Sequence, residues 1–238
     1  MMSLPSKTTM MKAKTMKPTT DPTLEAARTK ILDAALTRVA DEGWTSDVLD
    51  QAVVESNIDA PLAARAFPNG LASLIDAFHR RADASMEKRL AQTDLSAMKI
   101  RDRISLAVRL RLLAMEPHRE AARRAMVVQG LPANVGPSLA GLYRTADAIW
   151  YAIGDTSTDF SFYTKRALVS GVYASTSVVW MSDQSDEFED TWAFLDRRIT
   201  DALKLGGLRR KLPSLEGLLG RWPGPRGIRR PLSRSPGR

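Results

Sequence analysis

The chain of 238 residues contains no cysteine, which excludes disulfide bonds and thiolate metal ligands. It has two histidines, His79 and His118, and each is predicted to lie among arginines on the polar face of a helix. We interpret both as solvated side chains. No Ser-His-acid or Cys-His set can be assembled around them, so neither predicts nucleophilic catalysis.

The sequence also lacks a glycine-rich phosphate loop and a Glu-x-x-His pair of metal ligands. Its densest acidic group stands where a helix is predicted to begin. Acids in that position cap the first turn and complement the helix dipole, which we favour over a metal site. The sequence therefore predicts a protein that works by binding, without a cofactor. The acidic group consists of Asp183, Asp186, Glu187, Glu189 and Asp190.

No apolar run approaches the roughly 20 residues that a membrane-spanning helix needs. The net charge of +8 comes from the two ends of the chain. Residues 1–20 carry four lysines and no acid, and residues 208–238 carry nine basic residues and one acid, so residues 21–207 have a net charge of −4. Basic ends attract polyanions, which include nucleic acid and an anionic membrane surface.

Apolar residues recur at helical spacing through most of the chain, and no strand pattern competes. Thr45 and Asp59 are predicted to cap the second and third helices. The segment 160–181 is apolar on nearly all sides, which predicts a helix buried centrally or at a dimer interface. We predict an all-α bundle of about nine helices followed by a C-terminal amphipathic segment. Its parts are a disordered basic tail (1–22), a helix-turn-helix-like subdomain (23–93), a ligand-binding helical subdomain (94–207) and a basic amphipathic or disordered tail (208–238).

The order of the first four helices resembles that of tetracycline-repressor-type regulators, with Phe67 just after the expected recognition helix. The charge of this module argues against DNA binding. Residues 24–80 contain nine acids and five basic residues, and the recognition stretch 60–67 offers one basic residue, Arg65. Phosphate contacts supply much of the affinity for DNA, so we predict that this module binds no nucleic acid.

Two segments carry a more specific resemblance. Residues 154–167 read Gly-Asp-Thr-Ser-Thr-Asp-Phe-Ser-Phe-Tyr-Thr-Lys-Arg-Ala, and residues 181–192 read Met-Ser-Asp-Gln-Ser-Asp-Glu-Phe-Glu-Asp-Thr-Trp, with Phe-Leu-Asp-Arg-Arg at 194–198. Together they resemble the ubiquinone (coenzyme Q) biosynthesis accessory proteins, a lipid-binding family with a tetracycline-repressor-like fold. The resemblance extends over about residues 31–205.

This resemblance implies a non-enzymatic protein that holds an isoprenoid quinone precursor or a phospholipid. It further implies a homodimer that presents its ligand to a demethoxyubiquinone-type di-iron hydroxylase. The expected location is cytoplasmic, on the inner face of a bacterial inner membrane, or on the matrix side of the mitochondrial inner membrane in a eukaryote. The alternative is a transcriptional regulator with a small-molecule cavity.

A lipid cavity is predicted where apolar stripes of several helices face one another, although such stripes also describe a filled core. The residues predicted to line it are Ile104, Val108, Leu112, Leu139, Leu142, Leu168 and Val172.

The resemblance places the hydroxylase-docking surface at Asp159, Phe162, Tyr163 and Arg166, with Phe162 where the family often has tryptophan. The residues themselves predict a helix capped by Asp159. Phe162 and Tyr163 would point about 100° apart, so that one ring can join the core while the other stays outside. An exposed aromatic ring beside Arg166 is typical of a binding hot spot.

The last apolar series is spaced by three or four residues and flanked by arginine and lysine, which predicts an amphipathic helix in the membrane interface. Pro213 and two glycines interrupt it, so a disordered basic tail is the alternative. The predicted membrane-binding residues are Leu212, Leu215, Leu218, Leu219 and Trp222.

Overall fold

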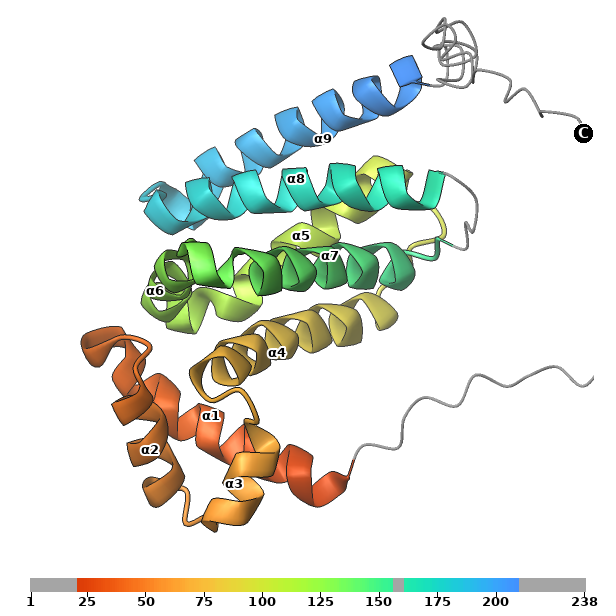
Figure 1. Ribbon diagram of the computed structural model, residues 1–238. Coiled ribbons are helices and arrows are strands. Elements are labelled where there is room, and N and C mark those ends of the chain that lie inside the picture. The colour runs from red at the N-terminus through yellow and green to blue at the C-terminus, as the bar shows by residue number, and fades with distance from the viewer. Residues whose placement is uncertain (1–20, 156–160, 210–238) are drawn as a thin grey trace, which may run out of the picture.

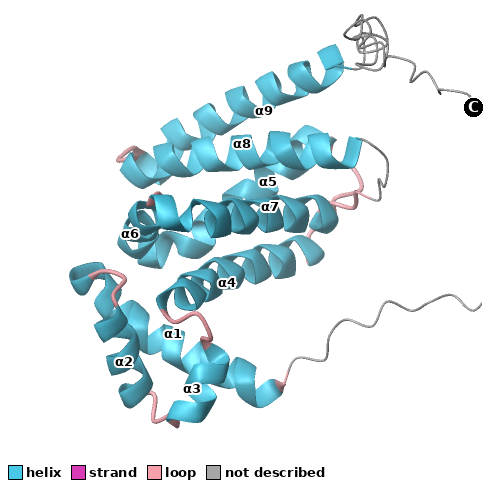
Figure 2. Ribbon diagram, in the orientation of Figure 1, coloured by secondary structure: helices cyan, strands magenta, loops and turns pink. Residues whose placement is uncertain are grey.

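The computed structural model describes residues 21–155 and 161–209, and within these ranges it contains nine α-helices, three short 3₁₀ helices and no strand (Figure 2). The prediction of an all-α fold is confirmed. The helices are α1 (Pro22–Glu42), α2 (Ser46–Glu55), α3 (Ala60–Ala66), α4 (Leu71–Ala91), α5 (Ile100–Met115), η1 (Glu116–His118), α6 (Arg119–Gln129), η2 (Pro132–Asn134), α7 (Val135–Ala152), α8 (Ser161–Ser182), η3 (Asp186–Phe188) and α9 (Glu189–Arg209).

The helices are arranged as a small N-terminal group and a larger stack (Figure 1). Helices α1, α2 and α3 pack together at one end. Helices α4, α7, α8 and α9 follow one another through the stack, and α5 contacts all four of them. Helix α4 also contacts α1 and so joins the two groups. The subdomain boundary between residues 93 and 94 stays a prediction.

Local capping explains where the N-terminal helices begin and end. The Thr45 hydroxyl accepts a hydrogen bond from the Val48 N–H at 3.2 Å, and an Asp59 carboxylate oxygen accepts one from the Leu62 N–H at 2.8 Å. Gly43 ends α1 with a φ of +79°, a conformation that costs glycine little. The two caps predicted from the sequence are therefore confirmed.

The N-terminal helices share a core with the rest of the molecule. The buried Trp44 indole donates a hydrogen bond to the Ala121 carbonyl on α6 at 2.8 Å, and its ring lies 5.6 Å from the ring of Phe78 on α4. Phe67 is also buried in this core. Arg65, the one basic residue of the expected recognition stretch, forms an ion pair with Asp21 at 3.4 Å. That pairing makes Arg65 less available to a phosphate backbone.

A buried polar network joins four helices. Arg111 of α5 is 1% exposed, and its Nε donates to a carboxylate oxygen of Asp83 on α4 at 2.6 Å. Its two Nη groups donate to the Tyr173 hydroxyl on α8 and, at 3.2 Å, to the Thr145 hydroxyl on α7. Thr145 in turn donates to Asp83 at 3.1 Å. Burial opposes the charge of Arg111, but Tyr173 and Asp83 outweigh it and raise the pKa of the guanidinium, which stays charged.

The residues predicted to bind the membrane, Leu212, Leu215, Leu218, Leu219 and Trp222, lie outside the described residues, as does Asp159. No helix in the described part of the chain is long and apolar enough to cross a membrane.

Replacing Arg111 by methionine is expected to lower the free energy of unfolding by about 3–5 kcal/mol, because the buried Asp83 would lose its hydrogen-bonded cation and keep only Arg144, 4.0 Å away. Urea denaturation followed by circular dichroism measures this change. Adding Asp83→Asn to Arg111→Met should recover a large part of the loss. If Arg111→Met alone were as stable as the parent, the Arg111–Asp83 ion pair would not hold these helices together.

Candidate functional site

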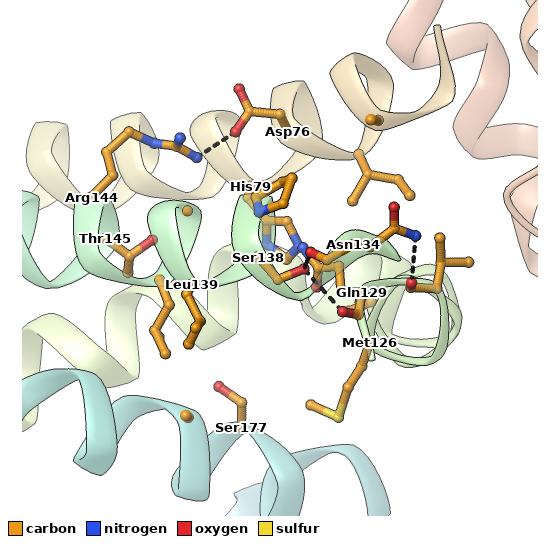
Figure 3. Close-up of a pocket in the computed structure, with 18 of the residues that line it drawn as sticks. Asp76, His79, Met126, Gln129, Asn134, Ser138, Leu139, Arg144, Thr145 and Ser177 are labelled. Atoms are coloured by element: carbon orange, nitrogen blue, oxygen red, sulfur yellow. Dashed lines mark hydrogen bonds and ion pairs between the residues drawn. The ribbon is translucent and has the colours of Figure 1, made fainter. Parts of the chain in front are cut away.

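A cavity of about 770 Å³ lies among α4, α5, α6, α7 and α8 (Figure 3). This volume falls in the range of small-molecule sites, which are concave and mostly apolar. Leu139 and Val178 line the cavity yet are 60% and 55% exposed, so it opens to solvent between α7 and α8. Apolar side chains make up much of the wall, among them Ile75, Met115, Met126, Leu139, Leu142 and Met181.

The structure divides the residues predicted to bind lipid into two groups. Leu139 and Leu142 of α7 line the cavity. The others do not line it: Leu168 is half-buried, and the remaining four are packed in the core. The side of α5 that reaches the cavity carries Arg111 and Met115 instead. Helical spacing identified the buried faces but could not show which of them borders open space. The four core residues are Ile104, Val108, Leu112 and Val172.

Polar side chains gather at two places on the cavity wall. At one, the Ser138 hydroxyl donates to the carbonyls of Gln129 and Asn134 at 3.0 and 2.7 Å, and the Asn134 amide donates to the Val128 carbonyl at 2.8 Å (Figure 3). These bonds shape the turn from α6 into α7. At the other place the Arg111 network borders the cavity through Arg111 itself, Thr145 and Tyr173.

His79 lines this cavity, which overturns its interpretation as a solvated residue. Its Nε2 atom is buried, and no hydrogen-bond partner for it exists in the described part of the chain. Burial, followed by the charge of Arg111, lowers the pKa of His79 to about 4. The sequence did hold a sign of this position. His79 lies four residues after Ile75 and four before Asp83, both of which are buried, so the three side chains share the inner face of α4. The prediction failed because the neighbouring arginines, Arg80 and Arg81, belong to the other side of the helix.

His118 is half-buried rather than fully solvated, and burial lowers the pKa of its imidazole as well. It does not line the cavity.

The predicted docking residues lie where α8 begins. Tyr163 is 67% exposed, whereas Arg166 is 4% exposed. The Arg166 guanidinium pairs with Asp147 of α7 at 2.5 Å and lies 3.9 Å from Asp155. Arg166 therefore holds α8 against α7, and Tyr163 presents the accessible surface. The side chain of Phe162 lies outside the described residues.

The acidic group before α9 acts through Asp183. This carboxylate is buried and accepts hydrogen bonds from the backbone N–H groups of Ser185 and Thr191, both at 2.8 Å. Burial opposes ionisation, yet these bonds and those from the two hydroxyls lower the pKa of Asp183. The predicted capping role is confirmed for this residue. Among the residues that the structure describes, no group of three acids or histidines has a geometry suited to a metal ion.

The fold defines a class of protein, an all-helical chain built like a tetracycline-repressor-type regulator. The TetR transcriptional regulator from Nitrosomonas europaea superposes with a TM-score of 0.60 and covers 75% of this chain and 98% of its own, at 21% sequence identity. That likeness shows the fold.

Sequence comparison then identifies the family. The COQ9 family model matches residues 135–206. The mitochondrial ubiquinone biosynthesis protein COQ9 of Rattus norvegicus is 35% identical over 208 residues, covering 82% of this chain and 66% of the rat protein. COQ9-B of Xenopus laevis is 34% identical, covering 82% of this chain and 71% of its own length. The chain belongs to the COQ9 family, as the resemblance of residues 154–198 predicted, and it spans slightly less than two thirds of the rat protein.

The depressed pKa of His79 predicts a pH dependence of stability. The His79 imidazole binds a proton near pH 6.5 in the unfolded chain and near pH 4 in the folded chain. The unfolded state therefore binds more protons between these values, and the free energy of unfolding falls as the pH drops from 6.5 to 4. Between pH 7 and pH 5 the loss should be about 2 kcal/mol. Urea denaturation at both values should show that His79→Gln loses about 2 kcal/mol less than the parent. The parent and His79→Gln both contain His118, so the contribution of His118 to the pH dependence cancels in the comparison. An equal loss in the two would show that His79 titrates normally.

Proposed function

We propose that this chain is a non-enzymatic accessory protein of ubiquinone biosynthesis, which holds the apolar tail of an isoprenoid lipid in the cavity beside α4, α6, α7 and α8. The observation that carries the proposal is a cavity of about 770 Å³ with a largely apolar wall and an opening beside Leu139 and Val178. Membership of the COQ9 family supports the assignment to this pathway, since the relatives are named ubiquinone biosynthesis proteins.

The energetics of burial favour a tail of this kind. Each buried CH₂ group contributes about 0.8 kcal/mol, so ten buried carbons would supply about 8 kcal/mol. Association and ordering of the tail then cost part of this gain. Several isoprene units are therefore enough for useful affinity without any charged contact.

Filling the cavity tests the proposal directly. Ala174 is half-buried on α8 and lines the cavity, so Ala174→Trp should place an indole in the space that the tail occupies. Bound isoprenoid lipid, measured by native mass spectrometry after incubation with ubiquinone carrying a two-isoprene tail, should fall about tenfold or more. Circular dichroism should show the helical fold retained.

The matched control is Ala167→Trp, on an exposed part of the same helix outside the cavity. It should bind lipid as the parent does. The cavity would be rejected as the site if Ala174→Trp retained the lipid, or if the unsubstituted chain bound none.

The proposal also includes presentation of the lipid to a di-iron hydroxylase by a homodimer at a membrane. Support comes from the family resemblance around residues 154–167 and from the exposure of Tyr163 in that region. The basic, leucine-containing tail from residue 208 would attach the protein peripherally to an anionic surface. Flotation on anionic vesicles of the full chain, compared with a chain that ends at Gly207, examines this attachment. The relatives are named mitochondrial, which supports a mitochondrial location for a eukaryotic chain. The matrix side of the inner membrane is part of the proposal.

Docking through Tyr163 predicts a loss of partner affinity without a loss of stability. Tyr163→Ala should weaken binding to the di-iron hydroxylase by on the order of 1–2 kcal/mol, as removal of a hot-spot ring does. The melting temperature should barely change, since Tyr163 is 67% exposed. Biolayer interferometry with the purified hydroxylase measures the affinity. Val54→Ala, which shortens a 79% exposed side chain on α2, is the control and should have no effect. Unchanged affinity of Tyr163→Ala would exclude this tyrosine from the interface.

A further inference from the structure

Two residues that line the cavity, His79 and Arg144, have a buried polar atom without a hydrogen bond among the described residues. Arg144 is held by its ion pair with Asp76 at 2.6 Å, whereas Nε2 of His79 has no such explanation.

The His79 side chain lies on the inner face of α4, one turn after Ile75, and it borders the same space as Gln129, Ser138 and Asn134 (Figure 3). A weak hydrogen-bond interaction with the Gln129 side chain raises the pKa of the imidazole slightly. No hydrogen bond of normal geometry, however, reaches the buried Nε2 atom from the residues that the structure describes. A buried polar atom without a partner is unfavourable, so a ligand that supplied a hydrogen-bond partner would bind more tightly.

The chemistry of the site selects the kind of ligand atom. A neutral imidazole carries one N–H donor and one acceptor nitrogen, and can therefore bind a hydroxyl or a carbonyl oxygen. It offers no positive charge to a phosphate or a carboxylate. Two cations border the cavity, and both are paired. Arg111 donates to Asp83, Tyr173 and Thr145, and Arg144 donates to Asp76 at 2.6 Å. An uncharged oxygen is thus a better match for this end of the cavity than an ionic head group.

We propose that His79 is the specificity-determining residue of the cavity, and that its Nε2 atom forms a hydrogen bond with a ring oxygen of a phenol or quinone head group. The ring would lie at the end of the cavity where His79 faces Gln129. The isoprenoid tail would follow the apolar wall that includes Leu142 and Met181. This inference rests on the proposed function, to which it adds the residue that recognises the ring and the place of the ring in the cavity.

The test compares two probes on the full chain by isothermal titration calorimetry. One is ubiquinone with a two-isoprene tail, and the other is farnesene, an isoprenoid hydrocarbon without oxygen. His79→Phe keeps a planar ring but removes both nitrogens, whereas His79→Gln places an amide near the position of Nε2. His79→Leu removes both nitrogens with a smaller side chain, should the phenyl ring prevent folding. His118→Phe is the matched control, because His118 does not line the cavity.

We expect His79→Phe to weaken quinone binding about 3- to 10-fold, the effect of one hydrogen bond, and to leave farnesene binding unchanged. His79→Gln should stay within about twofold of the parent, and His118→Phe should match it. Equal effects of His79→Phe on both probes, or no effect on either, would overturn the role of His79 while leaving the lipid cavity in place. If the parent chain binds neither probe, the proposed function fails.

A further measurement tests whether the site recognises a charged head group instead. Vesicle-derived phosphatidylglycerol should compete with the quinone through its acyl chains alone, so its affinity should not depend on His79. A loss of phosphatidylglycerol binding in His79→Phe as large as the loss of quinone binding would show that the site recognises a phosphate group, and would overturn the assignment to an uncharged ring.

Discussion

The buried ion pair between Arg111 and Asp83 is the constraint on which the ligand-binding half of the molecule depends. A charge placed in the interior is tolerated only where its partners lie at hydrogen-bonding distance, and here the partners come from α4, α7 and α8. Hydrogen bonds are directional, so they restrict the separation of these helices more tightly than apolar contacts do. The cavity lies beside this network and shares Arg111, Thr145 and Tyr173 with it.

The same network explains the character of the cavity. Arg111 stands close to His79 and, together with burial, keeps its imidazole uncharged, while the carbonyl of His79 lies 3.5 Å from an Arg111 Nη atom. The charge of Arg111 is balanced by Asp83 and does not confront the cavity as a free cation. Arg144, which also lines the cavity, is paired with Asp76 at 2.6 Å. The result is a largely apolar wall whose charged groups are paired and whose histidine is uncharged, which differs from an ordinary filled core and from a site for an anion.

The fold is shared with a class of DNA-binding regulators, and a fold by itself does not define function. In this chain the helix-turn-helix region is negatively charged, and Arg65 of its expected recognition stretch is paired with Asp21. The match to the COQ9 family model covers α7, α8 and most of α9; of these, α7 and α8 border the cavity, and α8 carries Tyr163. The alignment with the full-length relatives is longer and covers 82% of this chain.

What the sequence determined by itself was local. Thr45 and Asp59 could be predicted as caps because their partners lie three residues away. Helical spacing placed Leu139 and Leu142 on one face of α7, the face that borders the cavity. The tertiary structure alone decided that Ile104, Val108 and Leu112 pack into solid core, that Arg166 is buried against Asp147, and that His79 faces a cavity. A periodic pattern shows which side chains share a face, but the filling of the space opposite depends on other helices. From the sequence, a charged residue such as Arg111 is expected to be exposed. It is buried because the fold brings to it partners that lie 28 to 62 positions away along the chain.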